Sequence, residues 1–287
     1  GYYDSEKIRF RSGYPEKIGG WVRISANTFY GAVRTIWNWV TLASDNLIAV
    51  GTNQKYYVMN GATYNDITPV ASTTTLAADP IATVTGSNIV TITHAAHTQT
   101  AGTFVTFSGA AAVGTLTVVG EYEIVYVPTA NTYIILAASN GSVTASGGGG
   151  AVVAVYQLLA GLATYTLGTG RGAGAYGRGG WGSAATVGVG QQLSLWNQDN
   201  YGQNLVFSRR NGAIYYWAVD VSSYARAVTL NAASTSAGYS GGYVPNTTNQ
   251  IITSEQRFTI AFGANGYVSG NTSTTFDPML IRWSDQE

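Results

Sequence analysis

A hairpin-like motif that occurs twice constrains the fold of this chain more than any other feature. The segment at 46–59, NLIAVGTNQKYYVM, aligns without gaps on the segment at 204–217, NLVFSRRNGAIYYW. The alignment places Tyr57 on Tyr215. In both copies, runs of β-branched and aromatic residues surround a turn that contains Asn, which is typical of a β-hairpin. A repeat of this kind indicates a fold built from similar units.

Each hairpin belongs to a larger unit. A strand-like run with tryptophan precedes each copy, TIWNWVTL at 35–42 and LSLWN at 193–197. A looser third copy begins with RFTIAFGANG at 257–266, and its return strand at 279–283 follows a polar stretch at 267–278 that we expect to be a loop. Small antiparallel sheets repeated along a chain predict β-propeller-like blades, with the aromatic residues packed between adjacent blades. A β-sandwich is the main competitor.

The composition changes between the first two copies. No Lys or Arg occurs from residue 56 to residue 170. Within this stretch, residues 79–156 contain alternating strand patterns separated by Gly, Asn and Pro, with LAADP before them and SGGGG near their end. We predict a small β-barrel or sandwich inserted into a loop, where insertions cost least. The propeller-like domain would then have two parts, residues 1–78 and 157–287, around the inserted module.

Composition supports an all-β class and narrows the function. Helix patterns are nearly absent, only 10% of the residues are charged, and 45% are hydrophobic, which argues against disorder. The formal net charge is zero, so no bulk attraction to nucleic acid or acidic membranes is expected. The absence of cysteine excludes disulfides and thiolate metal sites. The chain begins at Gly1 without Met, and we interpret it as a segment of a longer or processed protein.

Motifs that suggest chemistry have simpler explanations. The GAGAYG stretch at 172–177 fits a dinucleotide-binding pattern but lacks the helix that the pattern requires, which favours a connecting loop. His94 and His97 lie at a strand end without a third metal ligand nearby. Glu121 and Glu123 share one face of an expected strand, and nothing suggests a cleft between them. We therefore predict no catalytic residue, no metal and no cofactor.

Aromatic and basic residues have both a structural and a binding interpretation. Arg9 and Arg11 alternate with Ile8 and Phe10 as on one exposed strand face, although a polybasic arm for nucleic acid is the alternative. Tryptophans can stack on sugars or bases, but most of them lie in strand patterns, so we expect packing roles. This set comprises Trp37, Trp39, Trp181, Trp196, Trp217 and Trp283.

Arg209 and Arg210 are the candidate contact residues. The following Asn211-Gly212 pair is the preferred dipeptide of a two-residue type I′ turn, which would place Ser208 opposite Tyr215 and both arginines at a solvated hairpin tip. The first copy has Gly and Thr at the two arginine positions, so the fold does not require the arginines. Our hypothesis for them is a contact with another subunit or with DNA in a channel.

Several segments resemble tail structural proteins of bacteriophages, and most closely the nozzle or tail-tube proteins of short-tailed phages. The segments that carry the resemblance are residues 9–21 (RFRSGYPEKIGGW), 46–69 (the first repeat and the residues after it), 176–182 (YGRGGWG), 193–217 (the second repeat and the strand before it) and 277–287 (DPMLIRWSDQE). Residues 86–136 are similar to a small β-barrel module often inserted in such proteins. The usual HGL..GD.V.F pattern of that module is degraded here to HTQTAGTFVTF, with His97 in place of its histidine.

The resemblance implies a propeller core and a ring of about six copies around a channel that the genome crosses during ejection. It implies a location in the virion tail, with adaptor and fibre proteins as partners and the host cell surface as a further contact. Such proteins carry no known active site, so no catalytic residue transfers. We expect a non-enzymatic structural subunit. The alternative is a tail component that binds or depolymerises host-surface carbohydrate, and a weaker one is a bacterial propeller-type adhesin.

Overall fold

The computed structural model describes residues 6–20, 23, 25–161, 195–239, 241–268 and 270–285. Its regular elements are β-strands, apart from the helix α1 (Leu230–Ser236) and the 3-10 turn η1 (Gly241–Tyr243). Thr229 caps α1, because its side chain accepts a hydrogen bond from the Ala232 N–H group. No described helix is long and apolar enough to cross a membrane. The all-β class is confirmed.

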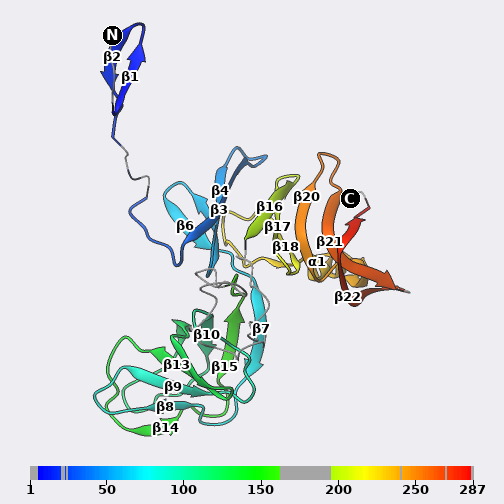
Figure 1. Ribbon diagram of the computed structural model, residues 1–287. Coiled ribbons are helices and arrows are strands. Elements are labelled where there is room, and N and C mark those ends of the chain that lie inside the picture. The colour runs from blue at the N-terminus through cyan, green and yellow to red at the C-terminus, as the bar shows by residue number, and fades with distance from the viewer. Residues whose placement is uncertain are drawn as a thin grey trace, which may run out of the picture.

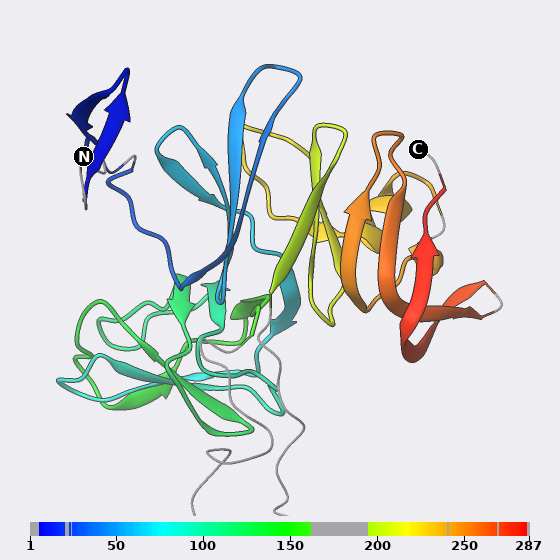
Figure 2. The same ribbon diagram turned by 45° about the horizontal axis from the view of Figure 1, so that its top comes forward.

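Three antiparallel sheets follow one another in space in the order of the chain (Figures 1 and 2). The first sheet contains β3 (Val33–Val40), β4 (Asn46–Thr52), β5 (Tyr56–Asn60) and β6 (Thr63–Asp66). The second contains β16 (Trp196–Tyr201), β17 (Asn204–Arg209), β18 (Ile214–Trp217) and β19 (Val228–Thr229). The third contains β20 (Thr248–Thr253), β21 (Thr259–Val268) and β22 (Asn271–Trp283). In the described part of the chain this row of sheets does not close into a ring, so a propeller is not confirmed.

The first and second sheets are joined by aromatic side chains, as the sequence predicted. Tyr56 stacks on Phe207 with 4.1 Å between the ring centroids and only 8° between the ring planes. The indole N–H of Trp196 reaches across to the Thr52 carbonyl oxygen at 2.6 Å. The same cluster holds Trp39, Leu47, Leu205, Tyr215 and Trp217, all of them buried. This contact removes a large apolar area from water and is the main source of cohesion between the two sheets.

The second and third sheets meet through smaller side chains. Val206 and Ile214 pack on Ile251 and Ala261. Polar side chains of β16 add hydrogen bonds to the free edge of β20. One example is the Ile251 N–H group, which donates to Asn197 Oδ1 at 2.7 Å. These bonds satisfy backbone donors that an edge strand would otherwise leave open.

The module between the repeats is a two-sheet sandwich. One sheet has the order β11-β10-β15-β7 and the other the order β12-β13-β9-β8-β14. Their strands are β7 (Val70–Thr75), β8 (Ile81–Thr83), β9 (Ile89–Thr93), β10 (Phe104–Ser108), β11 (Gly120–Glu123), β12 (Tyr126–Thr129), β13 (Thr132–Leu136), β14 (Ala145–Gly147) and β15 (Val153–Gln157). A continuous core, which includes Ile92, Phe107 and Tyr133, fills the space between them. The module lies beside the row of sheets and is attached to the first two of them (Figure 1).

The turn of the second repeat differs from the prediction. Ser208 pairs with Ile214 rather than with Tyr215, so the β17–β18 connection is not a two-residue turn. Only Asn211 takes a left-handed conformation, with φ of 59°. Gly212 instead forms a bridge with Thr248 at the start of β20. The type I′ prediction was wrong because the third sheet draws the loop into its own pairing, which no local pattern encodes.

The polar stretch at 267–278 is not a loop. β21 continues to Val268, and β22 begins at Asn271, so most of the stretch belongs to a long two-stranded arm. Its Thr residues are β-branched and suit strands, and shifts of register beside Gly263 and Pro278 accommodate the irregular residues. Serine and threonine in this stretch were therefore poor evidence for a loop.

The basic N-terminal segment forms a separate hairpin from β1 (Ile8–Arg11) and β2 (Tyr14–Lys17). Arg9 and Arg11 lie on one face of β1, as predicted, and Arg9 pairs with Glu16 at 3.0 Å. The hairpin stands away from the sheets in Figures 1 and 2.

Gly109, which follows β10, lies where the backbone of the module is closely packed. Its φ is +72°, and an added Cβ would overlap the Ala151 carbonyl oxygen. We expect Gly109→Ala to lower the unfolding free energy by at least about 2 kcal/mol, because left-handed strain and a backbone clash add. Gly86→Ala is the matched control, since Gly86 has a φ of +76° but open space around it. Thermal unfolding followed by circular dichroism would show the difference, and equal losses would contradict the clash.

Candidate functional site

Four charged side chains meet where the module joins the sheets. We call Lys55, Asp66, Glu121 and Arg226 the joint cluster. The Lys55 ammonium lies 2.8 Å from Asp66 and 2.5 Å from Glu121, and its side chain is only 3% exposed. Arg226 completes the cluster at 3.3 Å from Asp66 and 3.4 Å from Glu121. Two cations and two anions therefore balance one another in a confined space.

The first sheet, the module and the second sheet all supply residues to this cluster. Lys55 ends the β4–β5 turn, and its N–H group donates to Thr52 Oγ1 at 2.8 Å, which fixes the backbone. Asp66 is the last residue of β6, Glu121 lies in β11 of the module, and Arg226 comes from the β18–β19 connection. The joint cluster thus ties the first sheet, the module and the second sheet together.

Two aromatic rings surround the Lys55 side chain. Its Nζ atom lies 4.2 Å from the centre of the Phe104 ring and 5.5 Å from that of Tyr30, within reach of cation–π attraction. The two aromatic rings, one from the module and one from the segment before β3, lie 4.9 Å apart. They shield the ammonium from water and make its carboxylate partners harder to replace.

Two cations neutralise the Asp66 carboxylate. Burial raises the pKa of Asp66, but the charges of Lys55 and Arg226 and hydrogen bonds from Lys55 and Thr68 outweigh burial and hold that pKa below its usual value. Asp66 therefore remains ionised, and Glu121 also accepts a hydrogen bond from Gln157. A general acid must hold a proton, and the lowered pKa of Asp66 disfavours that role for this residue.

Because the pKa of Asp66 is lowered, the unfolding free energy of the protein should depend on pH in acid. The charged form adds stability that is complete above the unfolded-state pKa, near 3.8, and is lost as pH falls through the lower folded-state value. We expect Asp66→Asn to be less stable than the wild type at neutral pH, with the gap narrowing below about pH 4. Urea midpoints measured across this range would test it. A gap that is independent of pH would show that Asp66 acts only through packing.

Glu121 and Glu123 share one face, as predicted, and both point to the first sheet. Glu123 Oε1 accepts a hydrogen bond from the Gln54 amide at 2.9 Å, next to the contact between Lys55 and Glu121. The pair therefore attaches the module to one turn. The shared face follows from the sequence, but its partners Gln54 and Lys55 lie in a distant turn.

The two histidines pack against the module, with His97 buried and His94 half-buried. His94 Nδ1 lies 2.6 Å from the Tyr156 hydroxyl, and that hydroxyl lies 2.8 Å from the Tyr133 hydroxyl. Burial, and then the nearby His97, lower the pKa of His94. His97 is buried, and its Nε2 faces the backbone carbonyl oxygen of Thr129 at 3.1 Å. In the described ranges no group of three or more His, Asp or Glu side chains could hold a metal ion.

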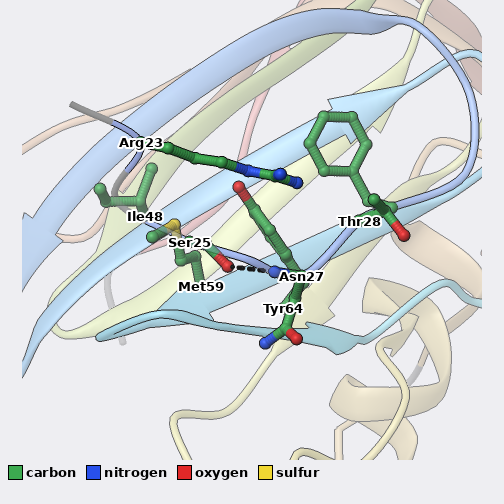
Figure 3. A pocket seen from close by; sticks show the side chains of 8 residues that line it. Arg23, Ser25, Asn27, Thr28, Ile48, Met59 and Tyr64 are labelled. Carbon is green, nitrogen blue, oxygen red and sulfur yellow. Dashed lines mark hydrogen bonds between the residues drawn. The ribbon is translucent and has the colours of Figure 1, made fainter. Parts of the chain in front are cut away.

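A pocket of about 450 Å³ opens on the face of the first sheet that points away from the second. We call it the end pocket. Its floor includes Ile48, Met59 and Tyr64, which are cross-strand neighbours on β4, β5 and β6. The segment before β3 forms the wall, and Arg23 extends across the opening in Figure 3. The remaining lining residues are Ser25, Asn27, Thr28 and Phe29.

Arg209 and Arg210 have different environments. Arg209 is partly buried and donates a hydrogen bond to the Leu159 carbonyl oxygen at 2.5 Å, so it holds the chain that returns from the module. Arg210 is exposed. The structure thus assigns a local role to one member of the pair and leaves the other accessible.

We expect Arg209→Ala to lower the unfolding free energy by about 1 kcal/mol, because a hydrogen bond from a charged donor is lost. Arg210→Ala should change it by less than about 0.5 kcal/mol. Urea unfolding followed by tryptophan fluorescence would measure both. Equal effects of the two variants would show that the bond to Leu159 does not matter.

Sequence reasoning missed the joint cluster. One signal was available, because Lys55 aligns with Ala213 of the second repeat and is the last cation before the long stretch without Lys or Arg. The partners of Lys55 could not be read from spacing, since Glu121 and Arg226 lie far along the chain. The glycine-rich stretch at 172–177 and Trp181 lie outside the described residues.

Comparison with known proteins assigns this chain to no family. No family model matches the chain, and no curated protein matches it. One solved structure that is similar is the phage phi92 endosialidase, with 13% identity and a TM-score of 0.27. The match covers 88% of this chain, which spans 36% of the endosialidase chain. At this level of similarity no shared activity follows.

Proposed function

We propose that this protein is a non-enzymatic structural subunit of a bacteriophage tail, of the nozzle or tail-tube type. Its role is to form a ring around the channel through which DNA is ejected. The sequence segments that resemble such proteins suggest the tail, and the open row of sheets suggests the ring. In this proposal the blades are propeller-like, and the partners are further copies, adaptor and fibre proteins, and the host surface.

The observation that carries the proposal is that both end faces of the row of sheets expose large apolar side chains. The first sheet exposes Ile36 and Val40 on the face away from the second sheet. The third sheet exposes Ile252, Ile281 and Trp283 on its own outer face. Exposed apolar surface of this extent at both ends favours a protein that assembles with neighbours.

The charge of the chain agrees with a passage for DNA. Formal net charge is zero, so the subunit does not bind phosphates strongly through bulk charge, and DNA can slide past it. Arg210 is the exposed cation at the β17–β18 loop and is our candidate for a transient phosphate or subunit contact. Arg209 is the weaker candidate for this contact, because its side chain is hydrogen-bonded to the Leu159 carbonyl oxygen.

Electron microscopy tests the proposal at two levels. Rings of the purified protein, and gold-labelled antibodies against it on the tails of phage particles, would support it. Antibody labelling of particles that is absent from tails would overturn the location. The Arg210→Ala variant should form the same rings, and a lower DNA-delivery rate in particles that carry it would support the contact.

A carbohydrate-binding or depolymerising tail component is the second candidate. The end pocket favours it, because Tyr64, Phe29 and Asn27 combine aromatic surface with an amide, as sugar sites do. A glycan array and a polysaccharide-cleavage assay separate the candidates. Binding or cleavage that is lost in Tyr64→Ala, by a protein that forms no ring, would favour the second.

A further inference from the structure

We propose that Trp283 at one end of the row of sheets inserts into the end pocket of a second copy of this chain. The inference rests on the proposed ring function and specifies which surfaces make the contact. Trp283 is 73% exposed although it lies in a sheet strand, β22. The end pocket is lined by residues of the first sheet. The first and third sheets lie at opposite ends of the row in Figure 2, so one copy cannot fill its own pocket.

The outer face of the third sheet follows from its pairing register. Ile251 and Ala261 are opposite one another and face the second sheet. Side chains alternate along a strand, so the next residues point the other way. The outward row is Ile252, Ile260 and Trp283, paired across β20, β21 and β22. Trp283 thus stands on an apolar platform rather than alone.

The outer face of the first sheet is its counterpart. Asn38, Ile48, Met59 and Tyr64 form one cross-strand row, and the last three line the end pocket. A cavity of about 450 Å³ is larger than one indole ring system. Arg23 extends across the opening in Figure 3. A guanidinium group in that place can make a cation–π contact with an inserted indole. Aromatic anchors in pockets of this kind dominate many interfaces.

We choose a second copy as the occupant of the end pocket, because such a contact would repeat the way the sheets already pack on one another within the chain. Within one chain, sheet faces join in order, first to second and second to third, through buried apolar side chains. A contact between the third sheet of one copy and the first sheet of the next extends the same series. The contact is heterologous, so each copy offers both surfaces and the assembly closes as a ring if the rotation allows. The net charge of zero means that copies do not repel one another strongly.

Sedimentation velocity over a range of concentrations tests this contact. We expect the wild type to associate, and we expect Trp283→Ala to raise the dissociation constant at least tenfold, as loss of an anchor residue does. Ile48→Arg, which fills the pocket, should do the same. If Ile48→Arg does not fold, Asn38→Arg replaces it as the pocket variant. Asn38 is exposed and is the cross-strand neighbour of Ile48. Leu42→Ala, at an 87% exposed site in the β3–β4 turn, is the control and should associate like the wild type.

A mixing experiment tests the head-to-tail geometry. Trp283→Ala retains an intact pocket, and the pocket variant retains an intact Trp283, so their mixture should form a one-to-one dimer that neither forms alone. Unchanged association of both single variants would overturn the contact while leaving a ring, and the proposed function, intact. Two weakened variants that do not dimerise when mixed would also overturn it. A wild type that stays monomeric at every concentration would overturn both the contact and the ring.

Discussion

Replacing Lys55 with methionine is expected to lower the unfolding free energy by about 3 kcal/mol. The methionine retains most of the apolar volume but leaves Asp66 and Glu121 close together without the ammonium that they share. Removing one partner of a buried ion pair leaves an uncompensated charge, which costs more than the pair gains. Arg226 still reaches both carboxylates, and these are partly exposed, so the loss falls at the lower end of the usual range.

Urea unfolding followed by tryptophan fluorescence would measure this loss in the row of sheets. No tryptophan occurs in residues 70–157, so the module contributes no tryptophan emission. Among the described residues, the tryptophans lie in strands of the three sheets, and they are Trp37, Trp39, Trp196, Trp217 and Trp283. The double variant Lys55→Met/Glu121→Gln should recover part of the loss because it removes one unpaired charge. Arg9→Ala is the control, since the Arg9–Glu16 pair is exposed and should contribute less than about 1 kcal/mol. Equal effects of Lys55→Met and Arg9→Ala would contradict the role of the joint cluster.

Phe207→Ala is expected to cost about 3–5 kcal/mol, the usual range for removing a buried aromatic ring. Phe207 is 0% exposed and stacks on Tyr56 of the first sheet. It also contacts Trp196 and Tyr215, with ring centroids 5.7 and 5.6 Å away. Its removal leaves a cavity between two sheets that cannot collapse onto each other without moving whole strands.

The same fluorescence assay would report the loss at Phe207. Phe207→Leu should cost less, because leucine fills more of the space than alanine does. Tyr126→Ala, at an exposed site in β12 of the module, should leave the tryptophan transition unchanged. If Phe207→Ala cost less than about 1 kcal/mol, the aromatic contact would not be what joins the sheets.

The sequence predicted the secondary structure better than the geometry of its turns. Alternating β-branched and aromatic residues indicated strands, and tryptophans in those strands indicated packing between sheets. The interface of Trp39, Trp196 and Trp217 bears this out. Trp283 does not follow this prediction, since it lies in a strand but is exposed. The strand pattern around it does not reveal whether another sheet covers that face.

The turn at Asn211 shows why local rules failed at specific positions. An Asn-Gly pair favours a two-residue turn in isolation, but here Gly212 pairs with Thr248 of the third sheet. The shift by one residue means that Tyr215, and not its neighbour, faces the first sheet beside Phe207. A one-residue change of register exchanges the two faces of a strand, so the ungapped repeat alignment could not match the packing.

The sequence by itself determined that this protein is a series of antiparallel sheets interrupted by a β-rich module, because strand patterns and turn residues act over a few neighbours. The tertiary structure alone decided the pairing registers, the joint cluster around Lys55, and the uncovered faces at the two ends of the row. Those features depend on residues that are distant in the chain, and their energies come from burial and charge compensation, which exist only after the sheets have packed.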